Sequence, residues 1–346
     1  MNQNQDYEPR PEEDGSACNT DTAPVTPPAP IDLRRERLQA ASVAFGVAFI
    51  SLFTAALQFL LVYLISCFAP ALADADWYVI VLSTAPMYAV AMPLSILLYR
   101  IGRAEPPPRH RMSSLVWFGL LAICFTLMYA GNFIGIIVNA IISIVTGKPV
   151  VNELAEMTLN TPLWANLLFC SILAPILEEL FYRKLVIDRL RRYGDLPAIL
   201  ISGVLFGLIH GNFSQFFYAA LIGVVFGYIY LRTGKLRYTV GLHMAVNLVG
   251  GVYATEMTKL LTPILESDNP LITMAQNPAA LAMLAPYLIF ITACIVTAPI
   301  ALVLLRKTIG FRKATVRLSA RDAVRVFLVN PAVWLLAGVI LLLFIA

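Results

Sequence analysis

Charged residues are scarce in this chain of 346 residues. They make up 13% of it, while 59% of the residues are hydrophobic, and soluble proteins usually carry about 25% charged residues. Apolar stretches close to the ~20 residues that a helix needs to cross a bilayer recur from residue 38 onward. A soluble core cannot absorb that much apolar surface, so the sequence predicts an all-α, polytopic transmembrane helical bundle.

Cysteines are few and far apart. The five cysteines, which include no close pair, are Cys18, Cys67, Cys124, Cys170 and Cys294. All of them except Cys18 fall inside apolar runs. This spacing indicates neither a disulfide framework nor a cysteine-based zinc site. Free cysteines are often simply buried small hydrophobic residues, and we assign these five no role.

Aliphatic runs are almost absent from the first 32 residues, which are rich in Pro, Asp, Glu, Thr and Asn. Such a segment cannot bury enough apolar surface to fold, so residues 1–32 are predicted to be a disordered cytoplasmic tail. The tail also lacks the basic start, short apolar core and small-residue cleavage site of a secretory signal. The first membrane span is therefore expected to act as its own insertion signal.

The apolar stretches after the tail define nine candidate spans, with boundaries uncertain by several residues. They lie at residues 40–69, 77–99, 113–140, 163–184, 196–211, 214–231, 238–255, 280–304 and 327–346. We divide the bundle of about eight to nine spans into N-terminal helices (33–150), a central core (160–255) and C-terminal helices (256–346). The run from 113 to 147 is too long for one straight span, so it is expected to tilt or to continue past the interface.

Basic residues collect in alternate loops. All but two of the 25 Lys and Arg residues lie before the first span or after the second, fourth, sixth and eighth, and the exceptions are Lys148 and Lys259. Because cytoplasmic loops are enriched in Lys and Arg, nine spans would place the N-terminus inside and the C-terminus outside. Topology and contact with anionic lipid account for these clusters, so membrane lipids are expected partners and nucleic acid is not.

Ionisable side chains inside the predicted spans gather in one region, from Glu178 to Asn247. Each charged group in hydrocarbon costs roughly 2.5–3.5 kcal/mol even on the mild insertion scale, so such a cluster indicates a functional site. On an α-helix Glu179 and Arg183 lie about 40° apart and can pair, whereas Glu178 and Arg183 lie about 140° apart. Glu178, with Tyr182 one turn along its face, is therefore the predicted reactive carboxylate, and Glu179 the structural one.

Two histidines complete the cluster. His243 and Asn247 are four residues apart and share a helix face, as do Phe206 and His210. One such histidine could equally be a hydrogen-bonded residue between helices; two of them with a glutamate favour a functional site. Glycines at four-residue spacing predict close helix packing rather than chemistry: Gly203, Gly207 and Gly211, and Gly223 with Gly227.

Three short motifs carry a resemblance to a known family. Glu178-Glu179-Leu-Phe-Tyr-Arg183 is similar to EExxxR, Phe206-Gly-Leu-Ile-His210 to FxxxH, and His243-Met-Ala-Val-Asn247 to HxxxN. Each motif alone is weak, but three in order, each in its own span, resemble the signature of the CAAX protease and bacteriocin-processing (CPBP) family, which includes the Ras-converting prenyl-protein endopeptidase. The resemblance covers about residues 160–255 and makes this region a catalytic transmembrane core.

The resemblance implies peptide-bond hydrolysis within the membrane. Carried over by position, Glu178 and His210 activate a water, and His243 and Asn247 face the carbonyl oxygen, while Glu179, Arg183, Phe206 and Tyr182 support them. Glu178, His210 and His243 could instead hold a catalytic zinc. No HExxH is present, and a buried glutamate can act as a base unaided, so we favour the version without a cofactor.

Depth within the membrane poses a difficulty. His210 falls about 20 Å from the cytoplasmic start of its span, whereas Glu178 and His243 lie near the cytoplasmic ends of theirs. The span of His210 is therefore expected to be short, tilted or sunken, with a water-filled chamber open to the cytoplasm.

The substrate expected from this arrangement is a protein or peptide, of CAAX type or a leader peptide, that enters from lipid or cytoplasm. Two other classes stay open: a non-catalytic scaffold or bacteriocin-immunity protein of the same fold, and a transporter or proton relay. The sequence shows no clear pair of inverted broken helices, which disfavours the transporter.

Overall fold

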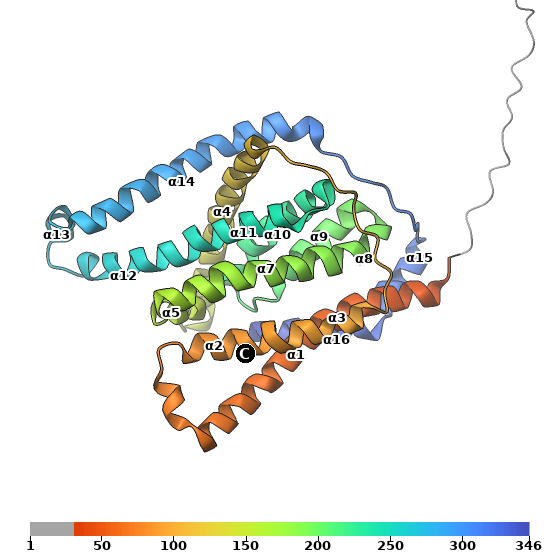
Figure 1. Cartoon of the computed structure of the whole chain (residues 1–346), viewed down its shortest axis with the longest axis horizontal. Helices are drawn as coiled ribbons and strands as arrows, with labels where there is room; N and C mark the ends of the chain where they lie inside the picture. The colour runs from red at the N-terminus through yellow and green to blue at the C-terminus, as the bar shows by residue number, and fades with distance from the viewer. Residues whose placement is uncertain (1–30, 346) are drawn as a thin grey trace, which may run out of the picture. The chain divides into compact units, whose positions relative to one another are not determined.

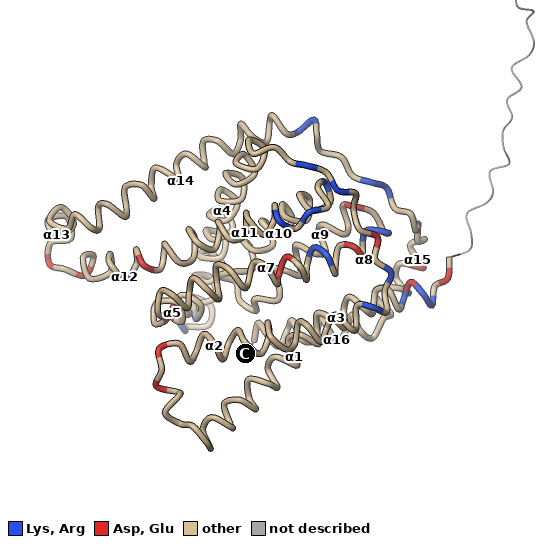
Figure 2. The backbone as a smooth tube through the Cα atoms, viewed as in Figure 1, with Lys and Arg blue, Asp and Glu red and all other residues tan. Residues whose placement is uncertain are grey.

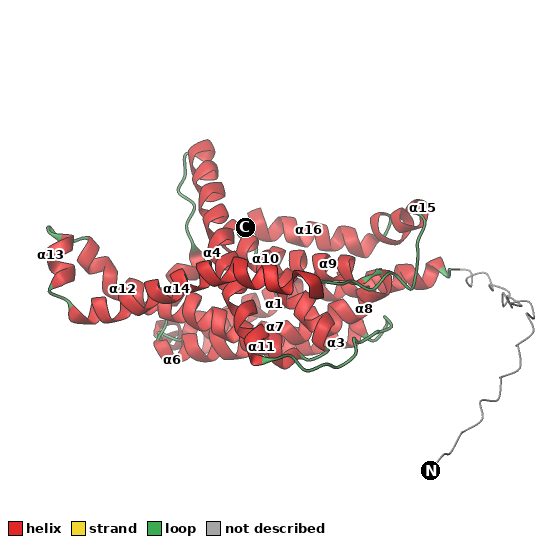
Figure 3. Cartoon of the chain, turned by 90° about the horizontal axis from the view of Figure 1, so that it is seen from above, coloured by secondary structure: helices red, strands yellow, loops and turns green. Residues whose placement is uncertain are grey.

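Helices dominate the structure, a computed structural model that describes residues 31–345; none of these residues lies in a strand (Figure 3). The predicted disordered tail falls outside the described residues, apart from its last two positions. The first half of the chain contains α1 (Leu33–Phe68), η1 (Pro70–Asp74), α2 (Tyr78–Ala85), η2 (Pro86–Ala91), α3 (Met92–Tyr99), α4 (Ser114–Thr146) and α5 (Glu153–Leu159). The all-α membrane bundle predicted from composition is confirmed.

The central core begins with a helix that changes its winding several times. It runs through α6 (Leu163–Ala165), η3 (Asn166–Leu173), α7 (Ala174–Glu179), η4 (Leu180–Ile187), α8 (Asp188–Leu190) and η5 (Arg191–Tyr193). After it come α9 (Asp195–Leu208), α10 (Phe213–Thr233), α11 (Leu236–Val246), η6 (Asn247–Tyr253) and α12 (Ala254–Leu265). Segments η3, η4 and η6 have π-type turns, which are frequent near functional sites.

The C-terminal part consists of α13 (Pro270–Ala275), α14 (Pro278–Leu305), η7 (Arg306–Thr308), α15 (Ala320–Ala323), η8 (Val324–Leu328) and α16 (Pro331–Ile345). Figure 1 shows α12 and α14 joined through α13, and α16 beside α1. From Asp32 onward the described residues of all three predicted membrane regions pack into one unit.

Six helical segments in the described range are long and apolar enough to cross a membrane, or seven if the bent pair formed by residues 320–328 and 331–345 counts as one span. Each of the nine predicted spans corresponds to a helical segment, but two fall outside this set. The α9 helix has only 14 residues, and α11–η6 carries the polar residues His243 and Asn247. The long apolar run after residue 113 forms the single helix α4, of 33 residues.

Lys and Arg gather at one end of the helices (Figure 2). The basic loops that follow α3, η4, α10 and α14 meet there, although they are far apart in the sequence. Asp and Glu predominate at the opposite end, around α13 and the α1–α2 connection, although Lys148 precedes α5 and Lys259 lies in α12. This segregation is what a positive-inside orientation requires.

The pairing of α9 with α10 shows why glycine recurs in this part of the sequence. A Cβ atom added to Gly207 would lie 2.7 Å from the carbonyl oxygen of Phe216, and one added to Gly203 would lie 2.8 Å from the backbone nitrogen of Val224. The two backbones therefore approach too closely for any side chain at these positions. The packing role predicted for the glycines is confirmed here, and it fixes the helix that leads to His210.

Candidate active site

The first motif lies where α7 passes into the wider turns of η4, just after Glu179. The angular prediction assumed a regular α-helix, and from Leu180 onward the structure departs from that geometry. Glu179 nevertheless pairs with Arg183, four residues later. The predicted pairing of Glu179 with Arg183 is therefore observed, although the 140° estimate for Glu178 and Arg183 does not hold for this winding.

Glu179 belongs to a closed and fully buried polar network. Its Oε2 accepts from Arg183 Nε at 2.9 Å and its Oε1 from Nη2 at 3.2 Å, and both side chains have no exposed surface. Arg183 Nη1 also donates to Ser202 Oγ, which in turn donates to the Tyr182 carbonyl oxygen. The guanidinium lies 5.2 Å from the ring centre of Phe206. This network ties η4 to α9.

Glu178 has a different environment, because its side chain is 14% exposed. Its Oε1 accepts a hydrogen bond of 2.7 Å from the hydroxyl of Tyr88, and its Oε2 lies 3.7 Å from His243 Nε2. The second distance is too long for a direct hydrogen bond. One oxygen of Glu178 is therefore held by protein, and the other faces an imidazole across a short gap.

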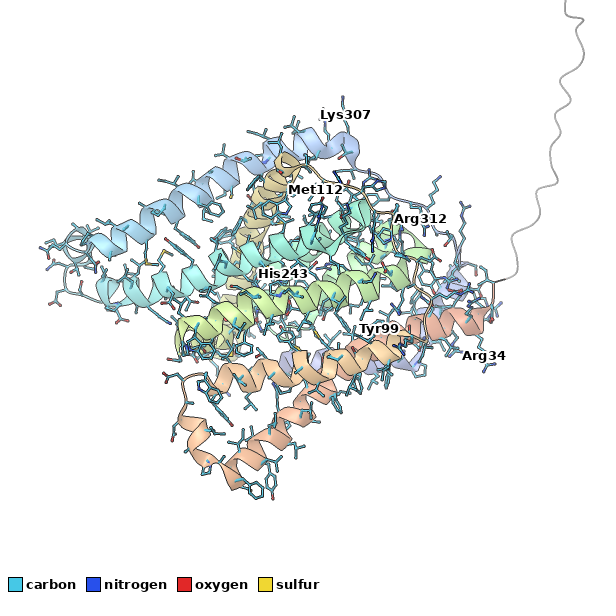
Figure 4. The ribbon with its side chains drawn as sticks, in the orientation of Figure 1. Arg34, Tyr99, Met112, His243, Lys307 and Arg312 are labelled. Atoms are coloured by element: carbon cyan, nitrogen blue, oxygen red, sulfur yellow. The ribbon has the colours of Figure 1, made fainter. Side chains whose placement is uncertain are left out.

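His243 lies on α11 between the two glutamates, near the centre of the helices drawn in Figure 4. Its Nδ1 lies 3.3 Å from Glu179 Oε1, and only 3% of its side chain is exposed. The rings of Phe206 and Phe226 pack against it, at 5.5 and 5.4 Å between ring centres. Because an ionised carboxylate only accepts hydrogen bonds, Nδ1 is the donor toward Glu179, and Nε2 is the nitrogen directed to the reactive side.

His210 follows the short helix α9. At about 1.5 Å per residue this helix is about 21 Å long, less than the ~30 Å hydrocarbon core. Gly211, with φ +69°, then reverses the chain into α10. Such a conformation is readily adopted only by glycine. The shortness predicted for this span is therefore observed.

The tautomer of neutral His210 follows from its partner. Nδ1 lies 2.8 Å from the carbonyl oxygen of Phe206, and a carbonyl can only accept, so Nδ1 carries the proton. Nε2 is then the unprotonated nitrogen. His210 is close enough to Glu178 and His243 for their charges to interact, although no direct contact joins it to either one in the described residues.

Asn247 has a structural partner that the sequence did not indicate. Its Nδ2 donates to the Cys170 carbonyl oxygen at 2.8 Å. The Ala174 amide bonds to Phe169 instead, and Pro175 has no N–H to offer. Asn247 thus satisfies a carbonyl that the bent helix leaves without its usual donor, and only the second N–H of its amide remains for a substrate.

The motifs in the sequence do not indicate Tyr88, because it lies in an apolar run 90 residues before its partner Glu178 and belongs to none of them. Its one local signal is a hydroxyl-bearing ring two residues after a proline in the middle of a predicted span. A contact between spans so far apart in the chain cannot be deduced from helical periodicity.

The predicted zinc ligands do not come together as a metal site. Among the described residues no group of three His, Cys, Asp or Glu side chains is arranged to hold a metal ion. The donor set Glu178, His210 and His243 therefore does not fit a zinc centre in this arrangement, and no chemical step is derived through a metal. The zinc alternative stays a prediction that chelation tests.

Fold and site together define a class: a multi-pass α-helical membrane protein in which a carboxylate and two imidazoles from separate helical segments lie near one another, with a carboxamide one helical turn after the second imidazole. Residues 160–249, which carry all three motifs, match the family model "Type II CAAX prenyl endopeptidase Rce1-like". The family resemblance inferred from the motifs is thereby confirmed over this segment, about a quarter of the chain.

Three curated proteins are similar to the chain. The "Putative membrane peptidase YdiL" of Bacillus subtilis (strain 168) is 32% identical over 78 residues, which are 22% of this chain and 32% of that protein. The "UPF0177 protein YxdF" of Lactococcus lactis subsp. lactis (strain IL1403) is 27% identical over 137 residues, 39% of this chain and 75% of that protein. The "UPF0177 protein YbdJ" of the same strain is 31% identical over 100 residues, 28% of this chain and 42% of that protein.

The matched region thus spans about a third of the first of these relatives. No solved structure is significantly similar to the chain.

Proposed function

We propose that this chain is an intramembrane endopeptidase that hydrolyses a peptide bond of a membrane-associated protein or peptide. The observation that carries the proposal is the contrast within the Glu178–Glu179 pair. Glu179 is neutralised by Arg183, whereas Glu178 is partly exposed and directs one oxygen toward His243. A carboxylate that is not consumed by a cation can accept a proton from water.

Water activation is the first step of the proposed reaction. A water beside Glu178 Oε2 and His210 Nε2 attacks the substrate carbonyl carbon, and one of these two bases takes its proton. The Phe206 carbonyl keeps the imidazole of His210 in the tautomer that accepts at Nε2. Positioned bases of this kind contribute about 10²–10⁴-fold to a rate.

Stabilisation of the oxyanion is the second step. Because His243 donates its Nδ1–H to Glu179, its Nε2 can donate to the oxyanion only in the imidazolium form, in which both ring nitrogens carry a proton. In that form Nε2–H and the remaining N–H of Asn247 face the negative charge that develops on the carbonyl oxygen. Donors that are already fixed in a water-poor pocket are effective because they need no reorganisation. Glu179 assists by holding His243 through Nδ1, and the buried Arg183 balances the charge of Glu179.

Collapse of the tetrahedral intermediate completes the cycle. The proton taken from water passes to the amide nitrogen, the C–N bond breaks, and a carboxylic acid and an amine leave; the acid then gives its proton to the amine or to water. An amphiphilic substrate suits such a site, since one part can stay in lipid while the scissile bond reaches Glu178. CAAX-type prenylated C-termini and leader peptides both belong to this class.

The test is cleavage of a panel of prenylated and leader-type peptides by the purified protein in detergent. Wild type is compared with Glu178→Gln, with and without a chelator. Cleavage that Glu178→Gln abolishes and the chelator leaves intact supports the glutamate mechanism. Loss on chelation that zinc restores would move the mechanism to a metalloprotease.

A folded wild type that cleaves nothing in a panel digested by a known CAAX-type protease would overturn the proposal. The scaffold function would then rank first. Solute flux across vesicles that Glu178→Gln impairs, without any cleavage, would instead indicate a transporter.

A further inference from the structure

Tyr88 links the N-terminal helices to the proposed catalytic carboxylate. It lies in η2, outside the segment that matches the family model, and its side chain is 9% exposed. Among the described residues its hydroxyl makes the only hydrogen bond to the Glu178 carboxylate, at 2.7 Å on Oε1. The buried Tyr88 hydroxyl is thus directed at the one carboxylate that the proposed reaction uses.

We propose that Tyr88 is a positioning residue for the reaction: its hydroxyl holds Oε1 of Glu178 so that Oε2 stays turned toward His243 and the attacking water. This inference rests on the proposed function. The terminal torsion of a glutamate is soft and lets the two oxygens exchange places. A hydrogen bond to one oxygen removes that freedom.

The helices that carry Tyr88 are fixed on both sides of it. Toward one end, Gln58 on α1 donates to the carbonyl oxygens of Leu82 and Ser83. Toward the other end, Arg189 donates to the Tyr99 backbone carbonyl at 2.6 Å. Tyr88 lies between these anchors, so its hydroxyl is delivered from a rigid element, as precise positioning requires.

The winding of η2 also matters for the direction of the tyrosine. Pro86 begins the segment without an N–H, and the amide of Met92 bonds back five residues to Met87. This widened turn lies in the middle of a long apolar helix, where a regular α-helix would place Tyr88 at a different angle. The local distortion and the contact with Glu178 therefore occur together.

Several other titratable groups surround Glu178 and bear on its response to pH. They come from every neighbouring element: Cys170 in η3, Tyr182 in η4, His210 after α9, Tyr218 in α10 and His243 in α11. Of these, only the two histidines change charge near neutral pH when unperturbed. A change at Tyr88 leaves all of them in place.

The experiment compares Tyr88→Phe with the control Tyr99→Phe. Tyr99 is buried in the neighbouring α3, and its hydroxyl bonds to a backbone carbonyl rather than to a carboxylate. For Tyr88→Phe we expect kcat to fall about 10- to 100-fold with KM unchanged, in line with a lost hydrogen bond to a charged group. The acidic limb of the kcat/KM profile should differ from that of wild type, whereas a loss of packing alone would leave the profile unchanged.

A second measurement does not depend on cleavage. Carbodiimides label protonated carboxyl groups, so labelling of Glu178 at increasing pH reports when it ionises, with Glu178→Gln as the blank. Tyr88→Phe should change the labelling midpoint, and Tyr99→Phe should not.

The inference is overturned if both tyrosine variants share the wild-type pH dependence in labelling and in cleavage. It is equally overturned if Tyr88→Phe loses activity only in proportion to a lower melting temperature, since the hydroxyl would then serve packing alone. If wild type cleaves no peptide while the labelling midpoint still shifts, the proposed hydrolysis fails and the contact itself stands.

Discussion

The two neighbouring glutamates on α7 have opposite environments. On one side Glu179 is sealed from solvent and bound by two nitrogens of Arg183; on the other Glu178 stays partly exposed, with a single tyrosine hydroxyl on it. A buried charge must be paired to be tolerated, and pairing removes it from chemistry. The comparison assigns Glu179 to the architecture of the helix bundle, and the proposed reaction requires the adjacent Glu178.

Glu178→Gln tests the reactive side most directly. We expect cleavage to fall by about 10⁴-fold, the upper end for loss of a positioned base, because an amide cannot take the proton from water. The melting temperature should stay close to that of wild type, since Tyr88 can still donate to the amide oxygen. A large loss of stability would instead place Glu178 in the architecture, and the contrast across α7 would disappear.

Arg183→Met tests the opposite side. Removing the cation leaves Glu179 buried and unpaired, so the free energy of unfolding should fall by about 3–5 kcal/mol. Denaturation in mild detergent measures it. The double variant Glu179→Leu/Arg183→Met should recover part of this loss, because two apolar residues need no partner. Equal stability of the single and double variants would contradict the assignment of a paired buried charge.

His210→Ala sharpens the comparison from a different element. The variant should lower kcat by about 10²–10³-fold, within the range of general base catalysis. His110→Ala serves as the matched control, because His110 is the one histidine on an exposed loop away from the site. If both variants cleave equally well, the pairing of His210 with Glu178 in water activation is wrong.

Asn247→Leu should have the smallest effect on the protein as a whole. It leaves the Cys170 carbonyl without a donor, so we expect the free energy of unfolding to drop by about 1–3 kcal/mol. Parallel rate measurements separate two roles of the amide. A rate loss of about 10²–10³-fold in a protein of unchanged stability would assign Asn247 to the oxyanion rather than to the link between the helices.

Composition and spacing were sufficient for the helical class and for the Glu179–Arg183 pair. Both depend on local rules. The shortage of charged residues indicates that the helices lie in lipid, and residues four apart still form an ion pair where the helix widens into η4. The shortness of α9 was also predicted, from the depth at which His210 had to lie.

The partners of Tyr88 and Asn247 could not be predicted in the same way. Each bonds to a group more than 70 residues away, and the orphaned carbonyl of Cys170 exists only because Pro175 interrupts a helix whose winding differs from the regular one. Helical periodicity carries no information on such departures. The nine predicted spans exceed the six or seven long apolar helices of the described residues for a related reason, since the polar site residues make α11–η6 less apolar than the surrounding helices.

The short α9 helix has a consequence for the surrounding lipid. Leu196, Leu200 and Val204 are exposed on it, between 41% and 45%, and such side chains need acyl chains around them. A helix of about 21 Å cannot match a hydrocarbon layer of ~30 Å, so the bilayer must thin or dimple beside α9. Water and head groups then come nearer to His210 than a flat membrane would allow. The mismatch would thus give the proposed enzyme a thinner bilayer beside α9, where a peptide bound at the membrane interface has only a short distance to travel to His210.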